Sequence, residues 1–219
     1  MNALIILGLL VVLMLTGMPI SISLGLTVLS FLFFLTEVPI ESVALKLFTG
    51  IEKFEIMAIP FFILAGNFLT HGGVAKRMIG FATSMVGHWH GGLGLGGVVA
   101  CALFAAVSGS SPATVVAIGS ILLPAMVKAG FPKSFGAGVI TTSGALGILI
   151  PPSIVMVMYS VSTNTSVGAL FMAGVIPGLL LAFFLGLTTW YRAKKNNYPC
   201  QPKATWAERW VAFRKAIWG

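Results

Sequence analysis

Acidic residues are almost absent from this sequence. Five of the 219 residues are glutamate, none is aspartate, and no carboxylate side chain occurs between Ile56 and Ala207. Charged residues make up 8% of the chain and hydrophobic residues 58%, whereas a soluble domain keeps about a quarter of its residues charged. The chain therefore has too few charges to cover a soluble fold, and we predict an integral membrane protein.

Catalytic and cofactor motifs are also scarce. Of the two cysteines, Cys101 lies in an apolar stretch and Cys200 in a basic loop, so we predict no disulfide and assign Cys101 to core packing. Residues 92–97 fit the dinucleotide pattern G-x-G-x-x-G, but no soluble strand precedes them and no acid follows about 20 residues later. Gly92 and Gly96 are better explained as small residues that permit close helix packing. With no Walker sequence and no catalytic cluster, we predict neither an enzyme nor a bound cofactor.

The net charge of +8 comes from basic residues that are grouped between apolar stretches. This arrangement is typical of cytoplasmic loops under the positive-inside rule and not of a nucleic-acid-binding face. We therefore predict membrane lipid, and no nucleic acid, as the surroundings of this chain. The groups are Lys76 with Arg77, Lys128 with Lys133, and Arg192 with Lys194 and Lys195.

Apolar stretches define the predicted helices, since a membrane span needs about 20 mostly apolar residues. Residues 3–35 are too long for one span and are interrupted at Pro19, which can open a second helix. The first of these helices lacks a basic flank, so we interpret it as retained and not as a signal peptide. Four of the five glutamates fall within 36–55, for which we predict an outside loop with a short amphipathic helix. The predicted apolar segments are 3–15, 19–35, 57–70, 79–86, 91–107, 115–127, 135–150, 154–159 and 169–191.

Cytoplasmic placement of the basic groups determines the predicted topology. Residues 91–127 then start and end on the same side, and their short arms favour a re-entrant hairpin over two full spans. Five crossings and one hairpin place the N-terminus outside and residue 219 inside. An odd number of crossings would insert a repeated unit upside down, so we expect an inverted second repeat beyond residue 219.

Two polar clusters interrupt the apolar sequence, at 108–114 (SGSSPAT) and within 141–153 (TTSGALGILIPPS). Consecutive prolines, Pro151 and Pro152, should break a helix. Unwound backbone at membrane depth is tolerated only where it lines a cavity or is buried in protein, and exposed helix ends there attract ions. The alternative is that the hydroxyls bond to their own helices and the prolines only kink them. The recurrence of the same residue types favours a binding site.

The missing carboxylates also favour one coupling ion over another. A proton-driven carrier usually places Asp, Glu or His within the membrane, and here only His71, His88 and His90 could serve, beside glycine-rich loops near the surface. Hydroxyl and carbonyl oxygens suit an alkali cation, so we predict sodium coupling. A site without carboxylates also accommodates a negatively charged substrate.

Four segments carry a resemblance to a known family. They are FAAVSGSSPAT at 104–114, GALGILIPPSIVM at 144–156, AIPFFILAG at 58–66 and GMPI at 17–20. The chain resembles, over essentially its whole length, the large membrane subunit of tripartite ATP-independent periplasmic (TRAP) transporters. TSVG at 165–168 and FMAGVIPG at 171–178 are most similar to the C4-dicarboxylate members.

The resemblance implies an all-α membrane protein, a polytopic helical bundle with one re-entrant helical hairpin and one broken transmembrane helix. It would form the first half of an inverted-repeat elevator-type transporter in the bacterial inner membrane. A small membrane subunit and a periplasmic substrate-binding protein would be its partners. The expected organisation is one membrane domain over 1–219, with scaffold-type helices and outside loop (3–70), re-entrant hairpin (91–127), broken helix plus following span (135–191) and interfacial helix (205–218).

Residue by residue, the same resemblance implies a sodium site and a substrate site. The substrate would lie near Ser111, Thr114 and Ser153, and residues of a second half would complete both sites. The sodium site would consist of Ser108, Ser110, Ser111, Gly144, Ile148 and Pro151, largely through backbone carbonyls.

The function that we predict is sodium-coupled secondary active uptake of a small carboxylate, most specifically a C4-dicarboxylate. Sialic acid and other organic acids stay open as substrates, because specificity also depends on the binding protein and on the second half. A channel or scaffold is a further alternative, but a channel should show a polar stripe along several helices, and the sequence shows only two isolated breaks.

Overall fold

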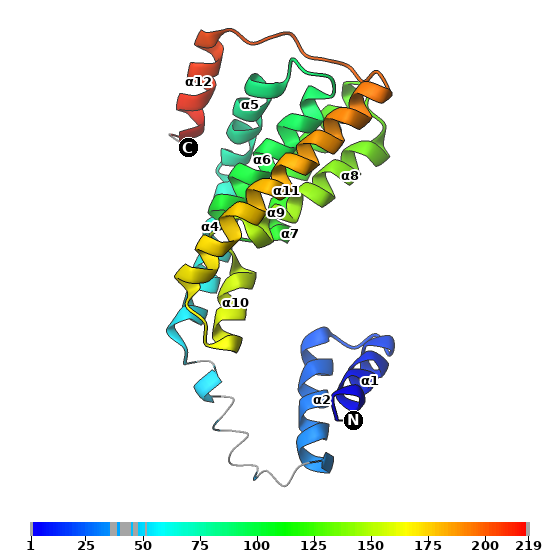
Figure 1. Ribbon diagram of the computed structural model, residues 1–219, viewed down its shortest axis with the longest axis vertical. Helices are drawn as coiled ribbons and strands as arrows, with labels where there is room; N and C mark the ends of the chain where they lie inside the picture. Colours follow the sequence, from blue (N-terminus) through cyan, green and yellow to red (C-terminus); the bar gives the residue numbers. More distant parts are fainter. Residues whose placement is uncertain (1, 36–38, 40–44, 46–47, 51, 218–219) are drawn as a thin grey trace. The chain divides into compact units, whose positions relative to one another are not determined.

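The computed structural model describes residues 2–35, 39, 45, 48–50 and 52–217, and their regular structure is helical throughout. The all-α fold class is therefore confirmed. The chain divides into two compact units, residues 1–53 and 54–219 (Figure 1). Glu37, Glu41 and most of the amphipathic helix predicted within 36–55 lie outside the described residues.

The first unit is a pair of apolar helices, α1 (Asn2–Leu15) and α2 (Ile20–Leu35). The predicted interruption at Pro19 is confirmed, and the chain turns there at Gly17, whose φ of 80° suits glycine. Most side chains of this pair are exposed, whereas Ser23 and Thr27 are buried. Thr27 Oγ1 donates to the Ser23 carbonyl, 2.7 Å away, which satisfies one hydroxyl within its own helix.

The second unit is a bundle of helices that pack around α6 (Figure 1). Two of its helices, Gly92–Ser108 and Ser111–Lys128, are joined by a tight hairpin turn. Another span is broken twice, after Gly144 and after Leu149. The helices are α4 (Phe54–His71), α5 (Val74–Val86), α6 (Gly92–Ser108), α7 (Ser111–Lys128), α8 (Lys133–Gly144), α9 (Leu146–Leu149), α10 (Ile154–Thr163), α11 (Val167–Lys195) and α12 (Trp206–Ile217).

Glycines set the close packing of α6 against its neighbours. A Cβ on Gly96 would lie 2.6 Å from Thr83 Cγ2 on α5, and a Cβ on Gly97 would lie 2.5 Å from Leu122 Cδ2 on α7. Gly92 is equally tight, because a Cβ there would lie 2.0 Å from the Gly87 carbonyl oxygen. The prediction that a small residue permits close helix packing is confirmed for Gly96, whereas Gly92 packs against Gly87 in the turn before α6. Cys101 is fully buried in this core, as expected.

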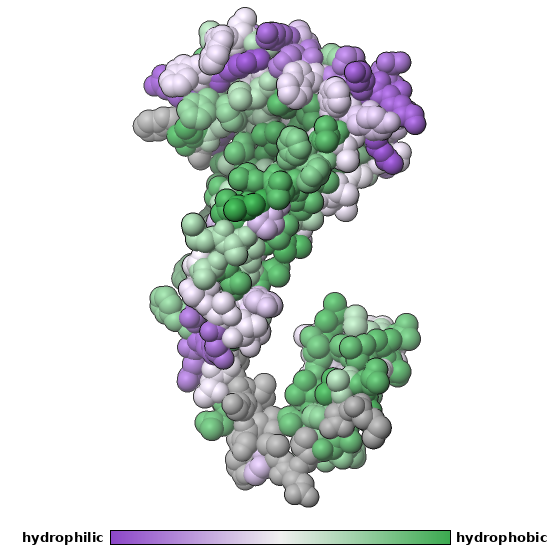
Figure 2. Space-filling view, in the orientation of Figure 1, coloured by the Kyte–Doolittle hydropathy of each residue, from purple (hydrophilic) through white to green (hydrophobic). Residues whose placement is uncertain are grey.

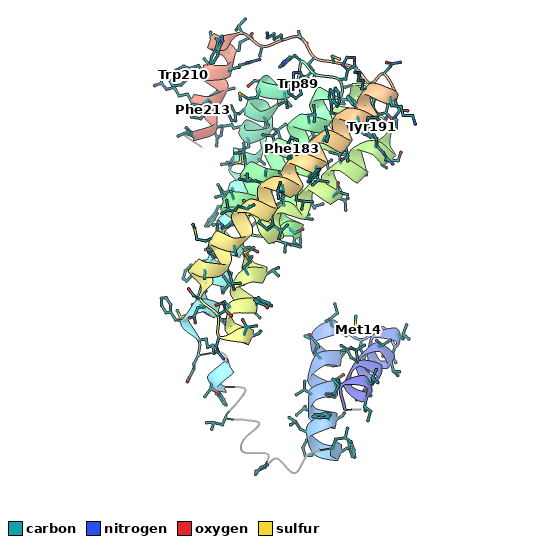
Figure 3. The ribbon with its side chains drawn as sticks, in the orientation of Figure 1. Met14, Trp89, Phe183, Tyr191, Trp210 and Phe213 are labelled. Carbon is teal, nitrogen blue, oxygen red and sulfur yellow. The ribbon has the colours of Figure 1, made fainter. Side chains whose placement is uncertain are left out.

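The surface of the second unit is apolar along its helices and strongly polar at one end, with a smaller polar patch toward the other end (Figure 2). Within the described part of the chain, α4, α7 and α11 are each long and apolar enough to cross a membrane, and α8 to α10 would count as a fourth span bent by 41°. The exposed aromatic side chains of Trp89, Tyr191 and Trp210 lie toward the polar end (Figure 3). Such residues are enriched where a membrane meets water.

Several helices are longer than the predicted apolar segments, and in α7 and α10 the added residues are polar. The second arm of the hairpin begins at Ser111 and not at residue 115, because Ser110 and Pro112 are helix-starting residues and not part of a loop. The polar residues 160–163 lie outside the predicted apolar segments, but α10 continues to Thr163. Its hydroxyls bond inside the helix, as when Ser162 Oγ donates to the Met158 carbonyl at 2.9 Å.

The last helix, α12, forms where the sequence predicted an interfacial helix, and Trp218 lies outside the described residues. Thr205 and Glu208 cap its start reciprocally: the Thr205 N–H donates to Glu208 Oε2 at 2.7 Å, and the Glu208 N–H donates to Thr205 Oγ1 at 3.4 Å. These hydrogen bonds hold the pKa of Glu208 below its usual value. The helix packs on α5 through Phe213 and Phe81, whose ring centroids are 5.4 Å apart.

Candidate functional site

The hairpin tip consists of two residues, Gly109 and Ser110, between α6 and α7. Gly109 has a φ of 62°, in the left-handed region that favours glycine, and so ends α6. Ser110 is extended (φ −128°, ψ 118°), and its hydroxyl accepts the Ala113 N–H at 3.4 Å. The tip therefore reverses the chain within two residues and starts α7 with a serine cap.

Two fully buried hydroxyls face each other beside this tip. Ser108 Oγ and Thr114 Oγ1 are 3.2 Å apart. Thr114 Oγ1 also lies 2.8 Å from the Ser110 carbonyl, to which it can donate, and the Ser110 N–H points to Ser108 Oγ at 3.5 Å. Three of the predicted site residues thus form one connected network of oxygen atoms.

The broken helix reaches its second interruption through a short, tightened segment. The Ala145 N–H donates to the Thr142 carbonyl and the Ile148 N–H to the Ala145 carbonyl, both three residues back instead of four. Ile150 is extended, and Pro151 and Pro152 follow, joined by a cis peptide. The predicted break at these prolines is confirmed.

The chain resumes helix at Ser153 in the same way as at Ser110. Ser153 is extended (φ −133°, ψ 125°), is fully buried, and accepts the Met156 N–H at 3.5 Å. The N-termini of α7 and α10 are therefore both capped by a serine, and each carries the positive end of a helix dipole.

A direct hydrogen bond joins the two interruptions. The Ile154 N–H, at the start of α10, donates to the Gly109 carbonyl at the hairpin tip, 3.0 Å away. A Cβ on Gly109 would lie 2.9 Å from the Pro152 carbonyl oxygen, so only glycine leaves room for this approach. The two polar clusters, far apart in sequence, therefore meet in one place.

Two glycines of the broken helix pack closely against the start of α7. A Cβ on Gly144 would lie 2.1 Å from Val115 Cγ2 and 3.6 Å from the Ser111 carbonyl oxygen. A Cβ on Gly147 would lie 2.9 Å from the Ser111 backbone nitrogen. The structure therefore brings Gly144 and Ser111 together, as the candidate site requires.

Ile148 and Pro151 are placed differently from the other candidates. Ile148 is 38% exposed, and because its side chain is aliphatic, only its backbone oxygen can serve as a ligand. Pro151 is half-buried at the break and likewise offers only its carbonyl. Ser110 and Ser111 are half-buried, whereas Ser108, Thr114 and Ser153 are inaccessible.

Three residues that the candidate list omitted also belong to this region. Gly147 packs on the start of α7, and a Cβ on Gly66 of α4 would lie 3.4 Å from Ser108 Cβ. Ser143 is fully buried, and its hydroxyl has no hydrogen-bond partner among the described residues. The spacing of Gly136, Ser143 and Gly147 was the signal that could have revealed Ser143 and Gly147, whereas no such signal points to Gly66.

The chemistry that the site offers is that of neutral oxygen atoms and helix ends. Among the described residues, no three His, Cys, Asp or Glu side chains cluster. The C-termini of α6 and α9 direct carbonyl groups toward the breaks, and the N-termini of α7 and α10 direct N–H groups there. Such an arrangement can hold a hard cation and an anion close together.

Comparison with known proteins gives a consistent result. Residues 7–219 match the family described as the tripartite ATP-independent periplasmic transporter, DctM component. The chain is 76% identical to the C4-dicarboxylate TRAP transporter large permease protein DctM of Rhodobacter capsulatus, over all of this chain and 53% of the relative. It is 53% identical to the proteins of that name from Vibrio cholerae (94% of this chain, 46% of the relative) and Pseudomonas aeruginosa (82% and 42%). The chain spans about half the length of these relatives.

Proposed function

Because the chain belongs to the family of the DctM component of tripartite ATP-independent periplasmic transporters, we propose that it forms the first half of a large permease subunit. This subunit uses a sodium gradient to drive uptake of a small carboxylate, most specifically a C4-dicarboxylate. The names of the three relatives support the substrate class. The absence of carboxylates between Ile56 and Ala207 supports an anionic substrate.

One observation carries the mechanism: the two helix interruptions are hydrogen-bonded to each other through Ile154 and Gly109. Unwound backbone from two segments is thereby concentrated in one region of an apolar bundle. Backbone of this kind is stable at membrane depth only if it is buried in protein or lines a cavity. Many secondary transporters bind substrate and ion where helices are interrupted in this way.

The sodium ion is held by oxygen atoms in this proposal. Hydroxyls and carbonyls of the hairpin tip and carbonyls of the broken helix coordinate it, since hard cations prefer oxygen ligands. The negative ends of α6 and α9 add to the attraction. The proposed ligands are Ser108, Ser110, Ser111, Gly144, Ile148 and Pro151.

The carboxylate binds at the N-terminal ends of α7 and α10, near Ser111, Thr114 and Ser153. Both ends present N–H groups and a positive dipole end, as anion sites at helix N-termini do. Ser153 already caps α10 through Met156, so its hydroxyl can still donate to a substrate oxygen. Binding of the cation beside the anion stabilises both, which couples the two ligands energetically.

The complete protein contains, in this proposal, a second and inverted half. Residues 3–70 belong to a scaffold, residues 91–127 re-enter the membrane as a hairpin, and the broken helix with the following span (135–191) moves with that hairpin in an elevator-like motion. Residues 205–218 lie on the cytoplasmic face of the bacterial inner membrane. A small membrane subunit and a periplasmic substrate-binding protein complete the transporter.

Uptake of radiolabelled succinate by the complete transporter, with and without a sodium gradient, tests the proposal. Ser110→Ala and Gly144→Val should each raise the sodium concentration for half-maximal uptake by about tenfold, the scale on which altered metal sites lose affinity. Ser120→Ala and Gly138→Val are matched controls, because Ser120 bonds within its own helix and a Cβ on Gly138 meets nothing within 4 Å. Unchanged sodium dependence in both site variants would refute the sodium site. Equilibration without accumulation would indicate a channel instead, and accumulation of other acids in place of succinate would exclude the C4-dicarboxylate assignment.

A further inference from the structure

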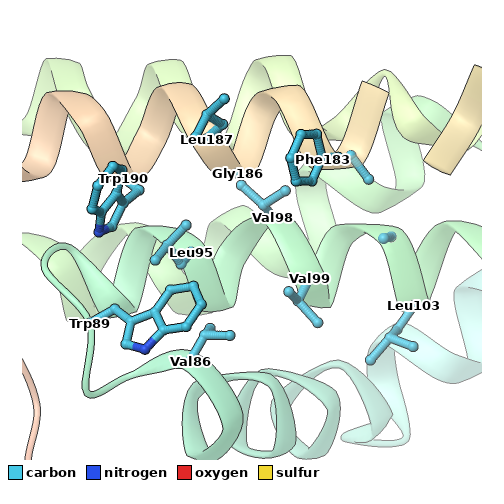
Figure 4. Close-up of a pocket in the computed structure, with 12 residues that line it drawn as sticks. Val86, Trp89, Leu95, Val98, Val99, Leu103, Phe183, Gly186, Leu187 and Trp190 are labelled. Atoms are coloured by element: carbon cyan, nitrogen blue, oxygen red, sulfur yellow. The ribbon is translucent and has the colours of Figure 1, made fainter. Parts of the chain in front are cut away.

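An apolar groove runs between α6 and α11, away from the two interruptions. It has a volume of about 550 Å³, and its lining is entirely apolar except for the indole nitrogens of two tryptophans. Leu95, Val99 and Leu103 contribute from α6, and Phe183 and Leu187 from α11 (Figure 4). From Leu95 to Leu103 the groove extends about 12 Å along the helix, at 1.5 Å per residue.

A second, polar hollow adjoins this groove. It has a volume of about 770 Å³ and is lined in part by Arg192 and Lys195, at the C-terminal end of α11. Leu187 and Trp190 line both hollows, so the basic hollow borders the apolar groove at these two side chains. Lys194 lies close by, with its Nζ 5.1 Å from the centroid of the Trp190 ring.

The two ends of the groove differ in the side chains that line them. Trp89 and Trp190 lie at one end, and Leu103 and Phe183 lie at the other (Figure 4). Tryptophan marks the level of the lipid headgroups, and basic residues mark the cytoplasmic side. The groove therefore leads from the cytoplasmic headgroup level toward the hydrocarbon interior.

We propose that the groove and the basic hollow together bind one anionic phospholipid of the cytoplasmic leaflet. An acyl chain lies along α6 between Leu95 and Leu103, and the phosphate contacts Arg192 and Lys195. Basic pockets between membrane helices on this side are suited to anionic headgroups. The charge is complementary, because no carboxylate side chain occurs between Ile56 and Ala207 to neutralise these cations.

The chemistry of the two hollows favours a lipid. An acyl chain matches the apolar lining of the groove, and an anionic headgroup matches the basic residues of the neighbouring hollow. This inference does not depend on the carboxylate or on sodium, so it can fail or succeed independently of the transport function.

Native mass spectrometry of the purified, delipidated chain with added dioleoylphosphatidylglycerol or dioleoylphosphatidylcholine tests the site. We expect a preference for phosphatidylglycerol that Arg192→Gln/Lys195→Gln lowers by about thirtyfold, at about 1 kcal/mol per basic residue. Lys128→Gln/Lys133→Gln removes the same charge outside both hollows and should change binding less than threefold. Equal losses in the two double variants would overturn the proposal, because they would show only diffuse attraction.

A second variant tests the apolar part without changing charge. A Cβ on Gly186 would meet only Leu95 Cδ2, at 4.0 Å, so Gly186→Leu should fill the groove and displace the lipid while the circular dichroism spectrum stays helical. Retention of phosphatidylglycerol by this variant would contradict the proposal. A photo-crosslinking residue in place of Val99 should yield an adduct of lipid mass in native membranes. An adduct with a second copy of the chain or with another protein segment would overturn it.

Discussion

At the hairpin tip and at the broken helix, one helix ends and another begins inside the bundle, but the first helix ends differently in the two places. At both places a buried helix stops and another begins after an extended serine, and the two serines have nearly the same backbone angles: Ser110 has φ −128° and ψ 118°, and Ser153 has φ −133° and ψ 125°. Each hydroxyl accepts the N–H three residues on, at 3.4 and 3.5 Å. The start of the second helix is therefore the same local structure in both.

The ending of the first helix is where the two regions differ. The tip ends α6 with a left-handed glycine, Gly109, and reverses the chain. The broken helix ends with Ile150 extended before two prolines, and the chain continues in roughly its former direction with a bend of 41°. Glycine therefore turns the chain and proline only interrupts it. Together they bring the hairpin tip into contact with the start of α10, through the hydrogen bond from Ile154 to Gly109.

The largest effect on this comparison should come from Gly109→Ala. Alanine in the left-handed region costs about 1–2 kcal/mol, and its Cβ would also lie 2.9 Å from the Pro152 carbonyl oxygen, which adds about 1–3 kcal/mol of overpacking. Gly130→Ala is the matched control, since Gly130 has a φ of 91° but a Cβ there meets nothing within 4 Å. Unfolding of the purified chain in mixed micelles should show a loss of about 3 kcal/mol or more for Gly109→Ala and less for Gly130→Ala. Equal losses would mean that the close approach of Gly109 to the Pro152 carbonyl adds nothing to the cost of an alanine in the left-handed region.

A smaller loss is expected from Thr114→Val, which keeps the shape but removes a hydroxyl. Thr114 Oγ1 lies 3.2 Å from Ser108 Oγ in a fully buried position, and the loss of a hydrogen bond costs about 0.5–1.5 kcal/mol. Thr188→Val is a suitable control, because Thr188 is exposed and bonds only within its own helix. The same unfolding measurement should separate the two variants. A Thr114→Val protein as stable as the control would show that the buried hydroxyl pair contributes nothing to the tip.

The three serine caps provide a comparison of similar local structures with different surroundings. Ser110, Ser153 and Ser166 each accept an N–H three residues on, but Ser166 is exposed and lies away from the two breaks. Replacement by alanine should cost about 1 kcal/mol of stability in all three. Sodium should protect the wild-type protein and the Ser166→Ala variant from unfolding, and protect Ser110→Ala and Ser153→Ala less. Identical sodium effects in all three variants would mean that the caps at the breaks stabilise the fold but do not contribute to sodium binding.

Much of this arrangement followed from local sequence rules. Apolar length predicted α4, and Pro19 and the Pro151–Pro152 pair predicted where helices are interrupted. The errors were local too. Residues 111–114 belong to a polar cluster outside the predicted apolar segments, although serine before proline is a typical helix start. Residues 160–163 also lie outside the predicted apolar segments, but hydroxyls such as that of Thr163, which donates to the Tyr159 carbonyl at 2.8 Å, are satisfied within a membrane helix.

The contact between the breaks could not be predicted from spacing. It depends on Gly144 and Gly147, which fit against Val115 and Ser111 only after the hairpin has packed on the broken helix. A glycine in sequence indicates that a close approach is permitted, but not which residue approaches. The hydrogen bond from Ile154 to Gly109 likewise joins backbone groups, which carry no residue-specific signal.

The smallest expected effect concerns the start of α12, which shares a hydroxyl cap with the two breaks but adds a carboxylate. Thr205 and Glu208 bond reciprocally, and these bonds lower the pKa of Glu208. Because the folded pKa is lowered, the stabilisation is present above the ordinary glutamate pKa, about 4.3, and is lost as the pH falls through the lowered value. The serine caps of α7 and α10 contain no titrating group and should not respond to pH.

Hydrogen exchange of the Thr205 amide, corrected for the intrinsic rate, should therefore lose protection severalfold between pH 6 and pH 3, whereas the Ala113 and Met156 amides keep theirs. Glu208→Gln retains the hydrogen-bonding shape without a titrating group, so its Thr205 protection should be independent of pH. If Glu208→Gln lost protection over the same range, the pH response would come from elsewhere. The carboxylate would then not be what distinguishes this helix start from the two in the bundle.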